Sequence, residues 1–200
     1  MKGGSGGVRV PNETVRGRLE LPLSDWNTRE GLRDSAVLAL LLEREGVDHL
    51  IFNRRRDDLP WHPGQICFPG GARDGDEGAV DCALRETCEE MGLEPGDIEV
   101  LGRLPERTSL AGFLVSLCVG RLKAVRAYTL AEDEVAEAFE VPCADLLLHD
   151  RWGYTETKHK LARFRKVPFF QHGERRIWGL TGIILRDFTT QVLGFAPPVG

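Results

Sequence analysis

The sequence lacks a C-x-x-C pair, and its five cysteines are an odd number. Both features argue against a disulfide framework and a structural zinc site, and they favour a reducing compartment. The sequence also lacks an apolar run of the roughly 18 residues that a membrane-spanning helix needs. Its first residues contain no hydrophobic core of a signal peptide. We therefore expect a cytoplasmic protein with no membrane partner.

A basic excess is absent as well. Lys and Arg number 26 against 31 Asp and Glu, which gives a formal net charge of -5. Proteins that bind nucleic acid through their overall charge are normally basic, so we expect no nucleic-acid partner. An acidic protein can still bind a small polyanion through a local basic patch or through a metal ion.

The chain is long enough for one domain with a core of its own. It has 200 residues, of which 42% are hydrophobic and 28% are charged, and these values are typical of a globular domain. The glycine-rich start, Gly3-Gly4-Ser5-Gly6-Gly7, indicates a disordered leader over residues 1–10. We expect a single domain over residues 11–200.

Short apolar runs between turn residues predict strands at residues 35–42, 49–52, 66–68, 98–104, 113–119, 135–141, 167–171 and 175–177. The last two flank His172-Gly173, which has the residues of a hairpin turn. Helical patterns cover residues 78–91, 144–149 and 180–193, and Gly92 is a typical helix-ending glycine. Trp178, beside apolar Ile177, is expected in the core. Strands and helices mix without strict alternation, which predicts a mixed sheet covered by helices.

Three carboxylates share one side of the helix predicted over residues 78–91. Glu86, Glu89 and Glu90 are spaced i, i+3 and i+4, so their side chains lie on one face. A separate apolar side consists of Val80, Leu84, Thr87 and Met91. Carboxylates at this spacing repel one another, and Mg²⁺ relieves the repulsion because it prefers oxygen ligands. Taken alone, such a triplet is more often a solvated acidic face.

The residues around this helix extend the pattern and reverse that judgement. Eight residues lie at fixed spacings from one another along the sequence: Gly71, Glu77, Arg85, Glu86, Glu89, Glu90, Gly92 and Leu93. The set resembles the Nudix box, G-x5-E-x7-R-E-U-x-E-E-x-G-U, in which U is an aliphatic residue. Thr87 departs from the box at an aliphatic position. It lies on the apolar side, where its methyl group can pack and its hydroxyl can bond to a preceding carbonyl.

The resemblance implies an α/β (α+β) fold, a Nudix-type α/β/α sandwich with a mixed central sheet and a loop-helix-loop catalytic motif. It implies Mg²⁺ or Mn²⁺ as cofactor, with Glu86 and Glu90 as principal ligands. Glu89 would be a further ligand or a water-orienting group, and the Gly71 carbonyl joins the candidate ligands. Glu77 and Arg85 would hold the loop and helix in register. Family members take the general base from the box or from a downstream loop.

The downstream loop contains two candidates for that base, Glu132 and Glu134. Either residue is equally consistent with a solvated loop charge, so the identity of the base stays open at this point.

The region before the box resembles the coenzyme A diphosphatase signature, L-L-T-x-R-S-x3-R-x3-G-x-V-x-F-P-G-G. The matching residues are Arg55, Gly64, Phe68, Pro69, Gly70 and Gly71. Asn53, Arg56 and Pro60 depart from it, and Pro60 removes a cation that would suit a phosphate. The resemblance implies hydrolysis of coenzyme A or acyl-CoA to 3',5'-ADP and an (acyl-)4'-phosphopantetheine.

Fork-shaped arginine donors favour phosphates, and several cations lie near the box in sequence. The candidate substrate-binding residues are Arg54, Arg55, Arg56, His62, Gly70, Gly71 and Arg73. The arginine triplet is equally consistent with a solvated turn. Trp61 is a candidate for stacking on an adenine, or it packs within its own loop.

Two other functions stay open. One is hydrolysis of another nucleoside diphosphate derivative, such as ADP-ribose or a dinucleotide. The other is a catalytically silent module that senses nucleotides, which the presence of Glu86, Glu89 and Glu90 disfavours. The expected partner is a small nucleotide, and assembly as a homodimer stays open.

Overall fold

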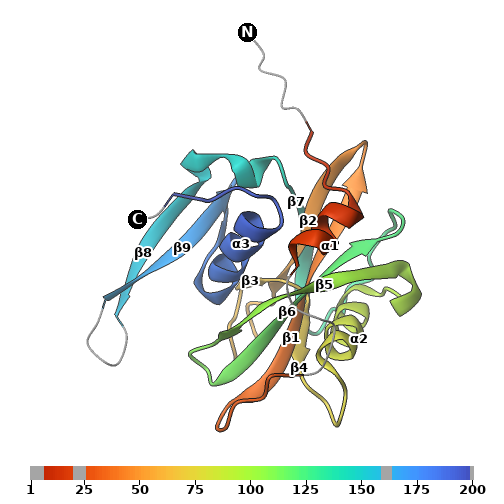
Figure 1. Ribbon diagram of the computed structural model, residues 1–200. Coiled ribbons are helices and arrows are strands. Elements are labelled where there is room, and N and C mark those ends of the chain that lie inside the picture. Colours follow the sequence, from red (N-terminus) through yellow and green to blue (C-terminus); the bar gives the residue numbers. More distant parts are fainter. Residues whose placement is uncertain (1–6, 20–25, 159–163, 199–200) are drawn as a thin grey trace.

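The computed structural model of the chain describes residues 7–19, 26–158 and 164–198 (Figure 1). The α-helices are α1 (Asn12–Arg18), α2 (Ala79–Met91) and α3 (Gly179–Gln191). The strands are β1 (Arg33–Arg44), β2 (Val47–Arg55), β3 (Ile66–Cys67), β4 (Gly70–Ala72), β5 (Ile98–Thr108), β6 (Phe113–Leu122), β7 (Val135–Pro142), β8 (Trp152–Lys158), β9 (Phe164–His172) and β10 (Arg175–Ile177). Short 3₁₀ turns are η1 (Pro95–Asp97), η2 (Asp145–Leu147) and η3 (His149–Arg151).

The larger sheet is mixed, as expected. Its strands follow the order β3-β2-β1-β6-β5, with β4 paired to β1 and β7 paired to β2. β1 runs parallel to β6, whereas the remaining pairs are antiparallel. Both faces of β1 are buried, which explains why its sequence is a nearly unbroken apolar run.

Helices cover both faces of this sheet. Because successive side chains of a strand point to opposite faces, β1 contributes to two separate apolar clusters. One cluster joins β1 to α2 through Leu38, Leu40, Cys82, Ala83 and Met91. The other joins β1 to α3 through Ala39, Leu41, Ile184, Leu185 and Phe188. Figure 1 shows α2 and α3 on opposite sides of the strands, so the predicted α/β/α sandwich is confirmed.

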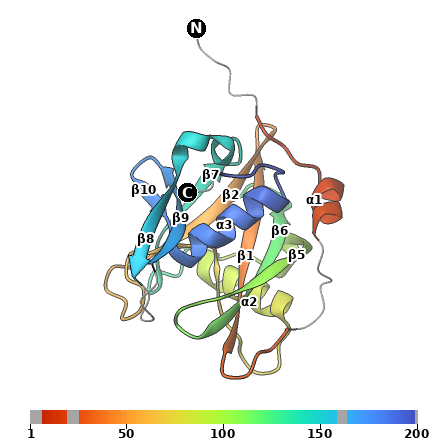
Figure 2. The ribbon, with the colours of Figure 1, turned by 60° about the vertical axis from the view of Figure 1, so that its left-hand side comes forward.

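A second, smaller sheet lies on the α3 side of the molecule. Its strands follow the order β10-β9-β8, and both pairings are antiparallel. Phe170 of β9 packs in the same cluster as Phe188 of α3, and Figure 2 shows α3 between the two sheets. The register pairs His172 with Arg175, which confirms the predicted hairpin at His172-Gly173.

The predicted strands are all present, most of them longer than expected, and the helices α2 and α3 lie close to their predicted bounds. Gly92 ends α2 in the left-handed conformation, with a φ of 65°, as predicted. The helix predicted over residues 144–149 is wrong. That segment forms η2 and η3, because Leu148 between them is extended, with φ −90° and ψ 111°.

Three elements were not predicted: α1, β4 and β8. In the described part of the predicted disordered leader, residues 8 and 10 form hydrogen bonds with β2. The backbone N–H of Val10 donates to the buried Asp48 at 2.8 Å, and the Val8 carbonyl accepts the Asp48 N–H at 2.8 Å. Val10 is buried, so an apolar side chain outweighs the glycine-rich context. Residues 1–6 lie outside the described residues.

The placement of Trp178 in the core is wrong. Trp178 is 44% exposed. Ile177 before it is buried, and neighbouring residues of extended backbone point to opposite sides, so Trp178 faces outward. Among the helices of the described residues, none is long and apolar enough to cross a membrane.

Candidate active site

The carboxylate-bearing helix is positioned by the strand and loop before it. β4 pairs with the start of β1, with Ala36 opposite Gly71. The chain then turns through residues 73–78 into α2, which packs on β1 with its apolar side. Thr87 is fully buried on that side, as predicted, but its hydroxyl has no hydrogen-bond partner within the described residues. The bond to a preceding carbonyl that this hydroxyl could make is not formed within the described residues.

Glu90 is the most buried carboxylate of the helix, with 4% of its residue exposed. Its Oε2 accepts two hydrogen bonds, from Asn53 Nδ2 at 2.9 Å and from the Gly70 N–H at 3.1 Å. Its Oε1 makes none with the described residues. Burial raises the pKa of Glu90 to about 7, against the effect of those two donors, and the charges of Glu86 and Glu134 add to the rise.

Glu86 lies directly against the glycine turn. A Cβ atom on Gly71 would stand 2.3 Å from the Glu86 carboxyl carbon, so only glycine admits this carboxylate. Burial raises the pKa of Glu86; the charge of Arg85 opposes that rise, and the charges of Glu89 and Glu134 increase it. Glu86 and Glu90 are spaced i, i+4 on α2, so the two carboxylates lie on one face of the helix.

Arg85 joins the loop to the helix. It donates to Glu77 Oε1 at 2.8 Å and to Oε2 at 3.0 Å. It also pairs with Glu86 and with Glu89, each at 3.0 Å. Hydrogen bonds from Arg85 lower the pKa of Glu77 to about 2, so Glu77 stays ionised at any physiological pH. The side chain of Glu89 is 61% exposed, which places it at the rim.

A downstream loop brings Glu134 to the same region. The Ala131 N–H donates to the Glu90 carbonyl at 3.0 Å, and the Glu134 N–H donates to the Ala131 carbonyl at 3.0 Å. The loop that carries Glu134 is thus fixed beside the end of α2, and the charge of Glu134 raises the pKa of both Glu86 and Glu90.

The donor set fits a hard divalent cation. Within the described residues, no three His, Cys, Asp or Glu side chains already surround a common cation position, and Arg85 pairs with Glu86 and Glu89. The free Oε1 of Glu90 and the carboxylate of Glu86 beside Gly71 nevertheless present oxygen atoms to one region. Mg²⁺ and Mn²⁺ prefer such oxygen ligands. Burial is the main cause of the pKa rises of the two carboxylates, and the charges of neighbouring carboxylates add to it; a bound cation would favour the ionised forms.

The three arginines after β2 have different surroundings. Arg54 pairs with Asp57 at 3.0 Å. Arg56 donates to Asp58 through Nε at 2.8 Å and Nη2 at 2.7 Å, and its Nη1 donates to the Glu132 carbonyl at 2.6 Å. Arg55 has no ion pair with the described residues, and its Nε is buried without a hydrogen-bond partner there.

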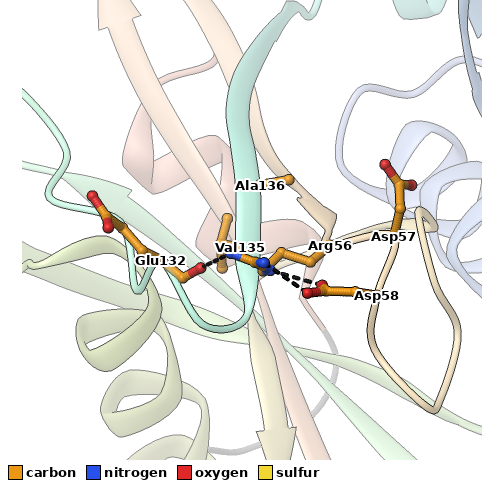
Figure 3. A pocket seen from close by; sticks show the side chains of 6 residues that line it. All are labelled: Arg56, Asp57, Asp58, Glu132, Val135 and Ala136. Atoms are coloured by element: carbon orange, nitrogen blue, oxygen red, sulfur yellow. Dashed lines mark hydrogen bonds and ion pairs between the residues drawn. The ribbon is translucent and has the colours of Figure 1, made fainter.

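Arg56 borders a pocket between the loop after β2 and the loop before β7. Its lining residues are Arg56, Asp57, Asp58, Glu132, Val135 and Ala136. Figure 3 shows the Arg56 guanidinium directed at Asp58 and at the Glu132 backbone. One cation faces three acidic residues in this pocket, so its charge does not favour a phosphate.

The other predicted substrate-binding residues are split between the site and its surroundings. Gly70 and Gly71 lie against Glu90 and Glu86, as described above. His62 is exposed in a left-handed backbone conformation, with a φ of 55°. The residue Trp61 is 76% exposed. Arg73 is occupied within the loop, where it donates to the Glu77 carbonyl at 3.1 Å and pairs with Asp34 at 3.3 Å.

Two residues of the site were missed by the sequence analysis. Asn53 is 1% exposed and donates to Glu90; a polar residue at the end of an apolar strand was the available signal. Trp26 donates through its indole nitrogen to the Glu77 carbonyl at 2.7 Å. It lies far from the box in sequence, and no local pattern indicates that contact.

Known proteins are similar to this chain in sequence and in fold. A family model described as the NUDIX domain matches residues 32–162. A protein of Pectobacterium atrosepticum named uncharacterized Nudix hydrolase NudL is 38% identical over 179 residues, covering 89% of this chain and 92% of the relative. The protein of the same name from Escherichia coli is 32% identical over 172 residues, covering 80% of this chain and 83% of the relative.

A crystal structure of a MutT/nudix family protein from Enterococcus faecalis has the same fold. It aligns with a TM-score of 0.52 at 18% identity, covering 86% of this chain and 71% of that one. The family match spans most of the chain, and it includes β1, β2, β4 and the whole of α2. This chain therefore belongs to the Nudix family, whose hydrolases act on nucleoside diphosphate derivatives.

Proposed function

We propose that this chain hydrolyses the pyrophosphate linkage of coenzyme A or an acyl-CoA, with Mg²⁺ or Mn²⁺ bound by Glu86 and Glu90. The observation that carries the metal-dependent chemistry is the arrangement of Glu90. Both of its hydrogen bonds go to Oε2, which leaves Oε1 available beside Glu86 and Glu134. The burial that raises its pKa to about 7 makes this carboxylate a strong ligand once it loses its proton.

When bound, the cation would stabilise charge on the phosphate oxygens and lower the pKa of the attacking water. The chain's own residues orient the reaction. Asn53 and Gly70 fix the Glu90 carboxylate, and the absence of a side chain at Gly71 lets Glu86 approach. Glu89 at the rim is a further ligand or water-orienting group.

Glu134 is the proposed general base. Its carboxylate is exposed, so it can take a proton from water and release it to solvent. The loop that carries it is fixed to α2 by the hydrogen bond from Ala131 to the Glu90 carbonyl. Glu132 is the weaker candidate, since its carbonyl accepts a hydrogen bond from Arg56 and the residue lines the pocket beside Asp57 and Asp58.

Arg55 is the proposed phosphate-binding cation. Alternate residues of a strand share a face, so Arg55 projects from the same side of β2 as Asn53, which binds Glu90. Burial raises the pKa of Cys67 to about 12, with Glu90 adding to the rise and Arg55 opposing it. That pair of effects supports placing the Arg55 guanidinium near the carboxylate site. The match of Arg55 to the coenzyme A signature supports the choice of substrate.

Arg55→Ala is expected to raise KM for coenzyme A by about 10- to 100-fold, because a charge-assisted hydrogen bond to phosphate contributes about 1.5–3 kcal/mol. Steady-state kinetics would measure it. Arg54→Ala, the matched control, should have a smaller effect because Asp57 already pairs with that guanidinium. Equal effects of the two substitutions would show that Arg55 has no special place in the site.

A second substrate class is favoured by one observation. Asp57 and Asp58 pair with Arg54 and Arg56, which reduces the cationic charge available for the 3'-phosphate of coenzyme A. A nucleoside diphosphate derivative without that phosphate, such as ADP-ribose, makes a smaller demand on these arginines.

A panel of substrates separates these functions. The protein would be incubated with Mg²⁺ or Mn²⁺ and, separately, with coenzyme A, acetyl-CoA, ADP-ribose, NADH or a diadenosine polyphosphate, and the products identified by mass. Release of 3',5'-ADP from coenzyme A or acetyl-CoA at the highest kcat/KM is the expected result. A higher kcat/KM on ADP-ribose would transfer the proposal to the second class. No product from any substrate would favour a nucleotide-sensing module.

A further inference from the structure

Trp26 connects the segment before β1 with the loop that begins the catalytic helix. Its indole N–H donates to the Glu77 carbonyl at 2.7 Å, in a partly buried hydrogen bond between residues 51 positions apart. Trp26 lies outside residues 32–162, which match the family model. The contact therefore joins a residue outside the matched region to Glu77, which belongs to the box.

Arg73 makes a second contact with the same carbonyl. Its Nε donates to the Glu77 oxygen at 3.1 Å, and its guanidinium lies 5.5 Å from the centre of the Trp26 ring. Asp34, at the start of β1, pairs with the other end of the guanidinium at 3.3 Å, and its side chain is only 9% exposed. Two donors from different segments therefore fix the position of the Glu77 backbone relative to the sheet.

The side chain of Glu77 connects the loop to α2. It accepts the Asp74 N–H at 2.8 Å within the loop, and it receives two hydrogen bonds from Arg85. Arg85 in turn pairs with Glu86 and Glu89. A continuous set of polar contacts thus joins Trp26 to the carboxylates of the site. Among the described residues, Trp26 and Arg73 make no polar contact with Glu86 or Glu90, so both act through Glu77.

We propose that Trp26 and Arg73 are positioning residues for the metal-binding carboxylates, acting through Glu77 and Arg85. The inference rests on the proposed function, since it assigns the site a divalent cation. Loss of the indole donor leaves the Glu77 carbonyl with one hydrogen bond and frees the loop to shift. A displacement of about 1 Å at a catalytic group can lower a rate by roughly 100-fold, so a partial shift should produce a measurable loss.

The test uses Trp26→Phe, which keeps an aromatic ring beside Arg73 but removes the N–H donor. Trp178→Phe is the matched control, because Trp178 is 44% exposed and directly precedes α3, which packs in a different apolar cluster from α2. Arg73→Lys is the second variant; it retains a charge for Asp34 but loses the bond from Nε to Glu77. Binding of Mn²⁺ without substrate is measured by electron paramagnetic resonance, alongside kcat, KM and the melting temperature.

We expect Trp26→Phe and Arg73→Lys to weaken Mn²⁺ binding by about tenfold and to lower kcat by a similar factor, with KM for the nucleotide nearly unchanged. Trp178→Phe should match the wild type. Wild-type Mn²⁺ affinity and kcat in folded Trp26→Phe or Arg73→Lys protein, with only a lower melting temperature, would overturn the inference alone. Wild-type protein that binds no Mn²⁺ would overturn the proposed function and the inference with it.

Discussion

Glu90→Gln is expected to lower turnover by roughly 1,000-fold or more, because it replaces a charged metal ligand worth several kcal/mol with a neutral amide. The fold should survive the change. Both hydrogen bonds to this side chain are accepted by Oε2, and the carbonyl oxygen of glutamine can accept them in its place. Steady-state kinetics at saturating Mg²⁺ measure the loss.

The same substitution is expected to stabilise the fold at alkaline pH. Burial raises the pKa of Glu90 to about 7, above the value of about 4.3 in an unfolded chain. The folded state binds this proton more tightly, so the contribution of Glu90 to stability is lost as the pH rises through 7. Ionisation of Glu90 then costs about 4 kcal/mol. Without metal, Glu90→Gln should melt about 7–15 °C higher than the wild type at pH 8.

The pH dependence identifies the cause of that gain. At pH 4, where Glu90 is protonated in both states, the two proteins should melt within a few degrees of each other. Glu89→Gln serves as the control for stability, since the Glu89 side chain is 61% exposed and should show no such gain. Near-normal turnover of Glu90→Gln would show that the metal site is misassigned, and a lower melting temperature at pH 8 would make Glu90 a structural residue.

Gly71→Ala is expected to lower turnover by about 100-fold while leaving the protein folded. The new Cβ would stand 2.3 Å from the Glu86 carboxyl carbon, which is closer than any real contact, so the carboxylate must move. Because the obstructed atoms end a flexible side chain, the movement does not disturb the core. A misplaced catalytic group accounts for a loss of about this size. Kinetics and Mn²⁺ binding together would measure the effect.

Gly96→Ala is the matched control for this substitution. A Cβ atom at Gly96 would meet nothing within 4 Å, and the residue lies in η1 (Pro95–Asp97), after the end of α2. It should retain wild-type turnover. If Gly71→Ala also retained wild-type turnover, the approach of Glu86 to the glycine turn would be unimportant for the reaction.

The sequence predicted those elements whose structure follows from a local periodicity of apolar residues. The apolar run of β1 and the helical spacing of α2 follow from burial of one or both faces, and the fixed offsets from Gly71 to Leu93 indicated the helix that carries the proposed metal ligands. The spacing of Glu86, Glu89 and Glu90 placed them on one side. It could not say that Glu90 is buried and Glu89 exposed, because that depends on β2 and on the glycine turn.

Contacts between distant segments were not predictable for the same reason. Trp26 meets Glu77 across 51 positions, and no pattern in either segment indicates the other. The pairing of Arg56 with Asp58, by contrast, joins near neighbours and accounts for part of the arginine triplet that the sequence left ambiguous. Trp178 was misplaced because apolar neighbours indicate burial of a segment but not the direction of each side chain.

The measurement that tests the central claim most directly is hydrolysis of coenzyme A in ¹⁸O-labelled water, with Mg²⁺ and with excess chelator. Our account predicts that Mg²⁺ supports cleavage, that one product phosphate carries a single ¹⁸O atom, and that the chelator and Glu90→Gln each abolish it. Cleavage that continues in chelator, or that Glu90→Gln leaves unchanged, would contradict a metal-dependent site on α2.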